Sequence, residues 1–223
     1  MTDDNQDNCC KESSAVSVFG RRWDVFPRVI VFDVDETLWP FWIDTHTIPP
    51  YRRIPSREKR PKKASRKSQV TMNNKNDDCK HQEHIVVDGS GNRLELFEET
   101  EMVLTTLQNV QGLKIAYASR TGEPSWMEEL AKTIFFAKSG GSMWDLPDYR
   151  EIYPGSKIRH FRSIARKSGV PCHEMLFFDD EPYNNMEVST ELGVTFVDAS
   201  GGITRDMVIH GLERYEQNFH DRS

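Results

Sequence analysis

Along the chain, short unbroken apolar runs alternate with longer stretches in which apolar residues recur every three or four positions. A short unbroken run is typical of a strand buried on both faces of a parallel sheet, and the longer spacing is typical of an amphipathic helix. This alternation predicts an α/β fold, with a doubly wound, Rossmann-like parallel sheet and helices on both faces. Strands are expected at about 28–34, 114–118, 175–178 and 194–197, and helices at about 98–110, 124–136, 156–168, 182–192 and 204–218.

Three further segments have weaker patterns. Residues 85–96 hold two short apolar runs around a Gly/Ser/Asn turn, which predicts a hairpin. A further strand is weakly indicated near 135–137, and the Gly, Pro and Asp residues of 139–148 predict a loop.

Two polar segments interrupt this periodic pattern. Residues 1–27 are expected to be a mostly disordered leader, although four apolar residues could pack against the edge of the domain: Val16, Val18, Phe19 and Trp23. Residues from about 50 to 84 are hydrophilic and nearly free of aliphatic side chains, so they cannot bury enough surface to offset their chain entropy. The sequence thus predicts one domain over 28–218, interrupted by a basic, disordered insertion at about 50–84.

The charge distribution separates this insertion from the rest of the chain. The net charge of the 223 residues is −6, yet residues 51–84 hold 11 Lys/Arg and 4 Asp/Glu, a local balance of +7, which leaves −13 for the remainder. An acidic body with one basic segment does not suit a general nucleic-acid binder, so we expect no nucleic-acid partner. The cluster at 57–63 is interpreted first as a solvated loop, and second as a nuclear-import patch or a docking site for acidic partners.

Location and oxidation state follow from what the sequence lacks. There is no apolar run long enough to cross a membrane and no signal peptide, so we expect no membrane association and a cytoplasmic protein, with the nucleus as the alternative. The four cysteines show no metal-ligand spacing and are expected to be free thiols.

The strongest chemical signal is the end of the first expected strand, where Asp33, Asp35 and Thr37 follow a buried apolar run. Each buried carboxylate costs several kcal/mol to desolvate unless a cation or hydrogen-bond donors compensate. The pattern therefore indicates a nucleophile and an acid/base beside a hard cation such as Mg²⁺, and the alternative is a solvated strand end.

Two other strand ends are also polar, with Ser119 and Arg120 at one and Asp179 and Asp180 at the other. Ligands of open α/β sheets bind outside the carboxyl ends of the strands, so these groups are expected to meet. With Lys157 they supply carboxylates for a cation and a hydroxyl, a guanidinium and an ammonium for an anion. This set suits phosphoryl transfer.

The segments Asp33-Val-Asp35-x-Thr37, Ser119, Lys157 and Asp179-Asp180 resemble the four motifs of the haloacid dehalogenase (HAD) superfamily of aspartate-nucleophile phosphatases. More narrowly, residues 32–46, 118–121, 150–157 and 177–181 look like the eukaryotic magnesium-dependent phosphatase-1 family. The resemblance covers about 28–48 and 93–215 and implies a HAD-like phosphatase domain. No large cap domain is expected, because the span between the first two motifs is mostly basic and aperiodic.

The resemblance also implies roles for the motif residues. Asp33 would be the nucleophile that forms an aspartyl-phosphate, and Asp35 the general acid/base. Mg²⁺ would be held by Asp33, the backbone carbonyl of Asp35 and Asp180, with Asp179 either in an outer position or sharing the role. Ser119, Arg120 and Lys157 would bind the phosphate, and Thr37 would hydrogen-bond the motif loop.

The expected function is therefore magnesium-dependent hydrolysis of phosphomonoesters by a monomer. An open site would admit a small phosphorylated substrate or a phosphoprotein, and the family has been linked to protein phosphotyrosine and to phosphosugars such as fructosamine phosphates. Two alternatives stay open, a phosphoryl transferase of the same superfamily and a non-catalytic scaffold that docks acidic partners through the basic insertion.

Overall fold

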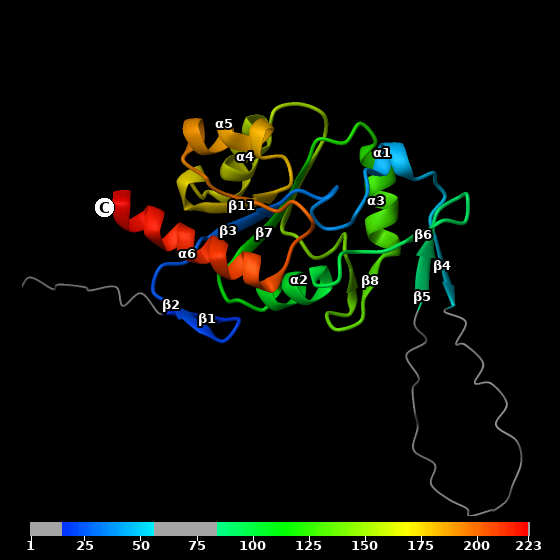
Figure 1. Cartoon of the computed structure of the whole chain (residues 1–223), viewed down its shortest axis with the longest axis horizontal. Helices are drawn as coiled ribbons and strands as arrows, with labels where there is room; N and C mark the ends of the chain where they lie inside the picture. The colour runs from blue at the N-terminus through cyan, green and yellow to red at the C-terminus, as the bar shows by residue number, and fades with distance from the viewer. Residues whose placement is uncertain (1–14, 56–83, 223) are drawn as a thin grey trace, which may run out of the picture.

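The computed structural model describes residues 15–55 and 84–222, and a five-stranded parallel sheet lies at its centre (Figure 1). The strand order is β10-β7-β3-β11-β12. These strands are β3 (Val29–Phe32), β7 (Lys114–Ser119), β10 (Tyr149–Ile152), β11 (Met175–Asp179) and β12 (Thr195–Asp198). The predicted doubly wound α/β fold is confirmed.

The central strand β3 divides its side chains between two cores. Ile30 and Phe32 belong to the larger apolar cluster, whereas Val29 and Val31 belong to a second cluster on the opposite face. All four side chains are fully buried, as expected for a strand with helices on both sides.

Helices cover both faces of the sheet (Figure 1). One face is covered by α4 (Lys157–Ser168) and α5 (Pro182–Leu192). The other is covered by α2 (Thr100–Gln108), α3 (Pro124–Thr133) and α6 (Arg205–Arg222). Each lies within a few residues of a helix expected from the sequence, and none in the described part of the chain is both long and apolar enough to cross a membrane.

The bounds of α4 show why these helices could be predicted. The Ser156 hydroxyl accepts a hydrogen bond from the Ile158 backbone N–H at 3.2 Å, which satisfies one of the free donors of the first turn. The helix ends at Gly169, whose left-handed φ of 69° costs glycine little.

The expectation for the leader needs correction for its last residues. Strands β1 (Val16–Val18) and β2 (Arg21–Trp23) form an antiparallel hairpin. Val18 and Trp23 are buried in the larger core, so their packing against the domain is confirmed and the folded part begins before residue 28.

The insertion also begins and ends inside a folded element. Strands β4 (Arg52–Pro55), β5 (His84–Val87) and β6 (Arg93–Leu94) form a three-stranded antiparallel sheet beside the main one (Figure 1). The β5–β6 pairing confirms the predicted hairpin, whereas β4 corrects the expectation that order is lost from residue 50. The basic cluster 57–63 lies outside the described residues.

The weakly indicated strand near 135–137 does not join the main sheet. β8 (Phe135–Phe136) pairs with β9 (Gly141–Ser142) in a small hairpin of its own, and the fifth strand of the sheet is β10 instead. The short elements α1 (Ile43–His46) and η1 (Cys172–Glu174) complete the described chain.

Candidate active site

Three neighbouring strands bring the predicted chemical groups to one edge of the sheet. Phe32 of β3 is in register with Tyr117 of β7 and with Phe178 of β11, so the residues that follow them emerge side by side. They line a pocket of about 320 Å³ that contains all seven predicted site residues: Asp33, Asp35, Ser119, Arg120, Lys157, Asp179 and Asp180. The predicted gathering of these groups is thus observed.

Lys157 is buried and lines the pocket. Its Nζ atom is 2.5 Å from Oδ1 of Asp33 and 2.9 Å from Oδ2 of Asp179, and it also donates to the backbone carbonyl of Ala118. Burial acts to lower the pKa of this ammonium group, but the two carboxylates outweigh it and raise the pKa above its usual value. Lys157 is therefore a permanent positive charge in the site.

One lysine does not balance the carboxylates around it. Asp33, Asp179 and Asp180 can place one carboxylate oxygen each within 4.8 Å of one another. Burial raises the pKa of Asp33 well above its ordinary value, with Lys157 opposing this. Burial and then the charge of Asp179 raise the pKa of Asp180 to about 6. Three convergent carboxylates with excess negative charge are a donor set that fits a hard divalent cation.

The Asp35 side chain is held by different partners. Its Oδ1 atom accepts hydrogen bonds from Nε1 of Trp39 at 2.7 Å and from the backbone N–H of Ile43 at 3.3 Å. The turn between the two motif aspartates and α1 passes through Glu36 in the left-handed region, with φ of 56°. Burial raises the pKa of Asp35 to about 7, which places its proton loss near neutral pH.

Ser119 and Arg120 continue directly from β7. The Ser119 hydroxyl oxygen accepts from the Thr121 backbone N–H at 3.2 Å, which leaves the hydroxyl hydrogen available to an anion in the pocket. The Arg120 guanidinium forms an ion pair with Glu181, the residue that follows the second acidic pair. The Glu181 backbone N–H in turn donates to Oδ1 of Asp179 at 2.8 Å, so β7 and β11 are linked across the pocket.

Sequence reasoning missed some supporting contacts. Two of them are the hydrogen bond from Trp39 to Asp35 and the ion pair between Arg120 and Glu181. Nothing in the sequence marks Trp39 or Glu181 for these contacts except that both lie close to the motifs. The expected hydrogen bond between Thr37 and the motif loop is present, because the Thr37 backbone N–H donates to the carbonyl of Val34 at 3.3 Å. The Thr37 hydroxyl has no hydrogen-bond partner among the described residues.

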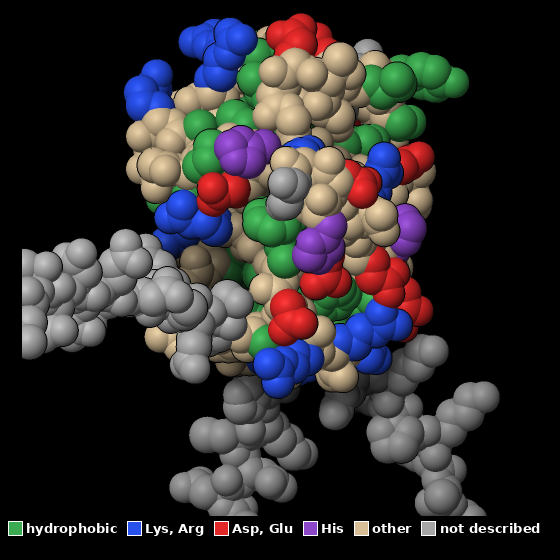
Figure 2. Space-filling view, turned by 90° about the vertical axis from the view of Figure 1, so that its left-hand side faces the viewer, with side chains coloured by type: hydrophobic (Ala, Val, Ile, Leu, Met, Phe, Trp, Pro, Cys, Tyr) green, Lys and Arg blue, Asp and Glu red, His purple; other side chains and the backbone are tan. Residues whose placement is uncertain are grey.

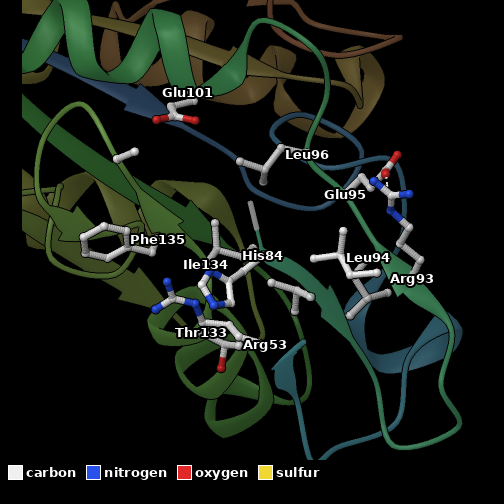
Figure 3. A pocket seen from close by; sticks show the side chains of 13 residues that line it. Arg53, His84, Arg93, Leu94, Glu95, Leu96, Glu101, Thr133, Ile134 and Phe135 are labelled. Carbon is white, nitrogen blue, oxygen red and sulfur yellow. Dashed lines mark ion pairs between the residues drawn. The ribbon is translucent and has the colours of Figure 1, made fainter. Parts of the chain in front are cut away.

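A larger hollow, of about 600 Å³, lies between the three-stranded sheet and the segment 133–137 at the end of α3 (Figure 3). Its walls include the apolar side chains of Leu94, Leu96 and Ile134. Arg93 is paired there with Glu95 at 2.5 Å, and this hollow gathers no set of buried carboxylates comparable, among the described residues, with the pocket at the strand ends. The smaller pocket is therefore the candidate active site.

Figure 2 shows acidic and basic side chains interspersed over one exposed face of the molecule.

Comparisons with known proteins agree with the geometry. Residues 25–218 match the acid phosphatase family. The chain is 35% identical to human magnesium-dependent phosphatase 1 over 192 residues, which cover 85% of this chain and 87% of the human protein. It is 34% identical to a HAD-like hydrolase superfamily protein of Schizosaccharomyces pombe over 176 residues, covering 78% of this chain and 86% of that protein.

A solved structure shares the fold at lower identity. It is the N-terminal part of a Bacteroides fragilis protein, described as containing a phosphatase domain complexed with Mg. The TM-score is 0.51 and the identity 16%, over 84% of this chain and 40% of the bacterial chain. The family match over most of the sequence and the identity to the human and yeast proteins show that this chain belongs to the acid phosphatase family, within the HAD-type phosphatases.

Proposed function

We propose that this protein is a magnesium-dependent phosphomonoesterase that works through an aspartyl-phosphate on Asp33. The observation that supports it is the buried cluster in which Lys157 contacts both Asp33 and Asp179 while Asp180 converges on the same point. The names of the human relative and of the bacterial structure support magnesium as the cation.

The metal would be held by Asp33, Asp180 and the backbone carbonyl of Asp35. Asp179 has less freedom to serve as a direct ligand, because one of its oxygens accepts from the Glu181 N–H and the other contacts Lys157. We therefore assign Asp180 as the direct ligand and Asp179 as its orienting neighbour. When bound, Mg²⁺ would offset the negative charge of the phosphoryl group and of the carboxylates.

Asp33 and Asp35 divide the chemistry between them. A carboxylate oxygen of Asp33 attacks phosphorus in line, the bond from phosphorus to the leaving oxygen breaks, and the Asp35 carboxyl gives its proton to that oxygen. In the second half, Asp35 takes a proton from water as the water attacks phosphorus. The bond between phosphorus and Asp33 then breaks and inorganic phosphate is released. A pKa of about 7 suits Asp35 to both duties.

The phosphoryl oxygens would be bound by the Ser119 hydroxyl, the Arg120 guanidinium and the Lys157 ammonium. Glu181 holds Arg120 at the pocket edge, and Ala118 and Asp33 hold Lys157 in the pocket. Charge-assisted donors fixed before the substrate arrives lower the cost of stabilising the transition state.

An exposed aromatic ring in the pocket lining supports a proposal for the substrate class. The pocket is lined on one side by Trp42, whose side chain is 47% exposed and stacks on His46 with ring centroids 5.8 Å apart. A flat exposed ring would contact either an aryl group or the face of a sugar. We therefore propose protein phosphotyrosine, phosphosugars such as fructosamine phosphates, or both as substrates.

The test is phosphate release by the purified protein. Hydrolysis of p-nitrophenyl phosphate is expected with Mg²⁺ and not in excess EDTA, and Asp33→Asn should be inactive. Full activity in EDTA or in Asp33→Asn would refute the mechanism. A screen of phosphosugars, fructosamine phosphates and phosphotyrosine peptides then identifies the substrate class.

A further inference from the structure

A buried histidine lies directly behind the phosphate-binding groups, and the mechanism above does not use it. His160 is one helical turn after Lys157 on α4, and its side chain is fully buried. Its Nε2 atom is 3.0 Å from the backbone carbonyl oxygen of Ser119 and 2.9 Å from that of Tyr153. The imidazole ring stacks on the Tyr153 ring, with centroids 4.2 Å apart and planes inclined by 15°.

These contacts constrain where the ring carries its proton. Burial lowers the pKa of His160, so the ring is neutral at physiological pH and has a single N–H group. Carbonyl oxygens only accept hydrogen bonds. Nε2 faces two of them, whereas Nδ1 faces only the Ser156 carbonyl, at 3.0 Å. The tautomer protonated at Nε2 therefore satisfies more of the buried acceptors.

The two carbonyl groups belong to parts of the site that are far apart in the sequence. Ser119 ends β7 and supplies the proposed phosphate-binding hydroxyl. Tyr153 begins the loop that leads through Ser156 into α4 and Lys157. The Tyr153 backbone N–H also donates to the Ser119 carbonyl, at 3.1 Å. One shared N–H of His160 thus ties the end of β7 to the loop that places the lysine.

We propose that His160 is a positioning residue, which fixes the Ser119 hydroxyl relative to the Lys157 ammonium so that both meet the same phosphoryl group. This inference rests on the proposed function. His160 does not touch the substrate; it acts through the backbone of Ser119 and of the loop before α4. Binding of phosphate, and not proton transfer, is the property that it controls.

Two substitutions separate the hydrogen bond from the volume of the ring. Gln can place an amide N–H near the position of Nε2, whereas Leu fills similar space without a donor. We expect His160→Leu to lower kcat/KM for p-nitrophenyl phosphate about tenfold and to raise the competitive Ki of inorganic phosphate by a similar factor, as expected when one buried hydrogen bond is lost. His160→Gln should stay within about threefold of the wild type in both constants. His173→Leu, which changes a histidine outside the pocket, is the matched control and should change neither.

A purely structural role would give a different result. In that case His160→Leu would lower the melting temperature but leave kcat/KM and the phosphate Ki of the folded protein unchanged, which overturns the proposal. Equal impairment of folded His160→Gln and His160→Leu would overturn it too, because the donor would then not be the cause.

A spectroscopic readout does not depend on activity or on the folding of a variant. Long-range ¹H–¹⁵N spectra of the wild-type imidazole groups, assigned with His160→Gln, should show His160 as the Nε2–H tautomer. An Nδ1–H tautomer would overturn the inference. If the wild type hydrolyses no phosphomonoester, the proposed function fails on its own. The tautomer and the affinity for inorganic phosphate, titrated by calorimetry, then still decide the role of His160.

Discussion

Replacement of Trp39 by Phe tests how the proposed general acid is held. The Trp39 side chain is fully buried and lies parallel to the Phe41 ring, with centroids 5.2 Å apart and planes inclined by 6°. A phenyl ring can keep much of this stacking, but it loses the Nε1–H that donates to Oδ1 of Asp35 at 2.7 Å. The substitution therefore removes one hydrogen bond from Asp35 while leaving the Ile43 N–H in place.

The magnitude follows from that single bond. Loss of a hydrogen bond of this kind costs about 1.4 kcal/mol, which corresponds to about a tenfold loss in rate when the bond orients a catalytic group. The Trp39 hydrogen bond also acts to lower the pKa of Asp35 against the larger effect of burial. Without it the pKa rises above about 7, so the protonated acid persists to higher pH.

Leaving groups of different basicity isolate this effect. An alkoxide needs a proton as it departs, whereas p-nitrophenolate leaves readily without one. Because hydrolysis of the aspartyl-phosphate is common to both substrates, the comparison uses kcat/KM, which reports the steps up to departure of the leaving group. We expect Trp39→Phe to lower kcat/KM about tenfold for an alkyl phosphate and much less for p-nitrophenyl phosphate, with the basic limb of the alkyl-phosphate pH profile of kcat/KM moved upward. Trp42→Phe changes an exposed ring that lines the pocket, so it should change KM but not the difference between the two leaving groups. Equal losses for both leaving groups in Trp39→Phe would refute the assignment of Asp35.

Three further outcomes are expected. Lys157→Met should lower kcat at least a hundredfold, because a fixed charge beside the phosphoryl group is lost, and steady-state kinetics measure it. Magnesium affinity, measured by calorimetry, should fall as pH drops through about 6, since Asp180 then becomes protonated and a metal ligand must be ionised; affinity that is constant from pH 5 to 8 would contradict this. Trp23→Ala should destabilise the domain by about 3–5 kcal/mol in denaturant unfolding, because it removes a large side chain from the core. An unchanged unfolding midpoint would show that the β1–β2 hairpin does not unfold together with the rest of the domain.

The main sheet could be predicted because its strands carry the signal themselves. Val29–Phe32 is apolar at every position because both faces are covered, whereas a strand with one solvated face would alternate apolar and polar residues. Helix α5 was predicted at its observed bounds, 182–192, because Pro182 and Gly193 mark its two ends. The site followed from the same strands, since parallel strands deliver their carboxyl ends to a common edge.

Among the small antiparallel elements, the β5–β6 hairpin could be predicted from its Gly/Ser/Asn turn, whereas strand β4 and the β1–β2 hairpin could not, because strands this short show no period. β4 reads Arg-Arg-Ile-Pro and is exposed at all four positions, so it resembles the polar segment that follows it. Its order depends on pairing with β5, across 28 intervening residues (56–83). The nearby Tyr51 is anchored by a backbone hydrogen bond to Glu129, 2.9 Å long, a contact that no local pattern announces.

The aromatic run after the first motif shows a subtler limit. Trp39, Phe41 and Trp42 lie within four positions, and such a run fits equally well as a wall beside the site or as part of the core; the structure uses it for both. Trp39 and Phe41 are buried in the core cluster, whereas Trp42 is exposed and lines the pocket. The composition of the run indicates that aromatic rings lie near the site. Which ring is buried in the core and which lines the pocket depends on how the chain turns into α1.

The charge balance of the pocket shows why its residues stand out in the sequence. Asp33, Asp35, Asp179 and Asp180 face one another with Lys157 as the cation among them, while Arg120 is already paired with Glu181. Folding alone would favour apolar residues or balanced pairs here, because desolvated carboxylates oppose burial. The raised pKa values of Asp33 and Asp180 express that cost.

A carboxyl with a raised pKa binds protons more tightly in the folded state. The metal-free protein should therefore lose stability as pH rises through about 6, and Mg²⁺ should restore more stability at pH 8 than at pH 5.5. Thermal unfolding at the two pH values measures this difference, and equal stabilisation by Mg²⁺ at both would show that the carboxylates do not form the cation site.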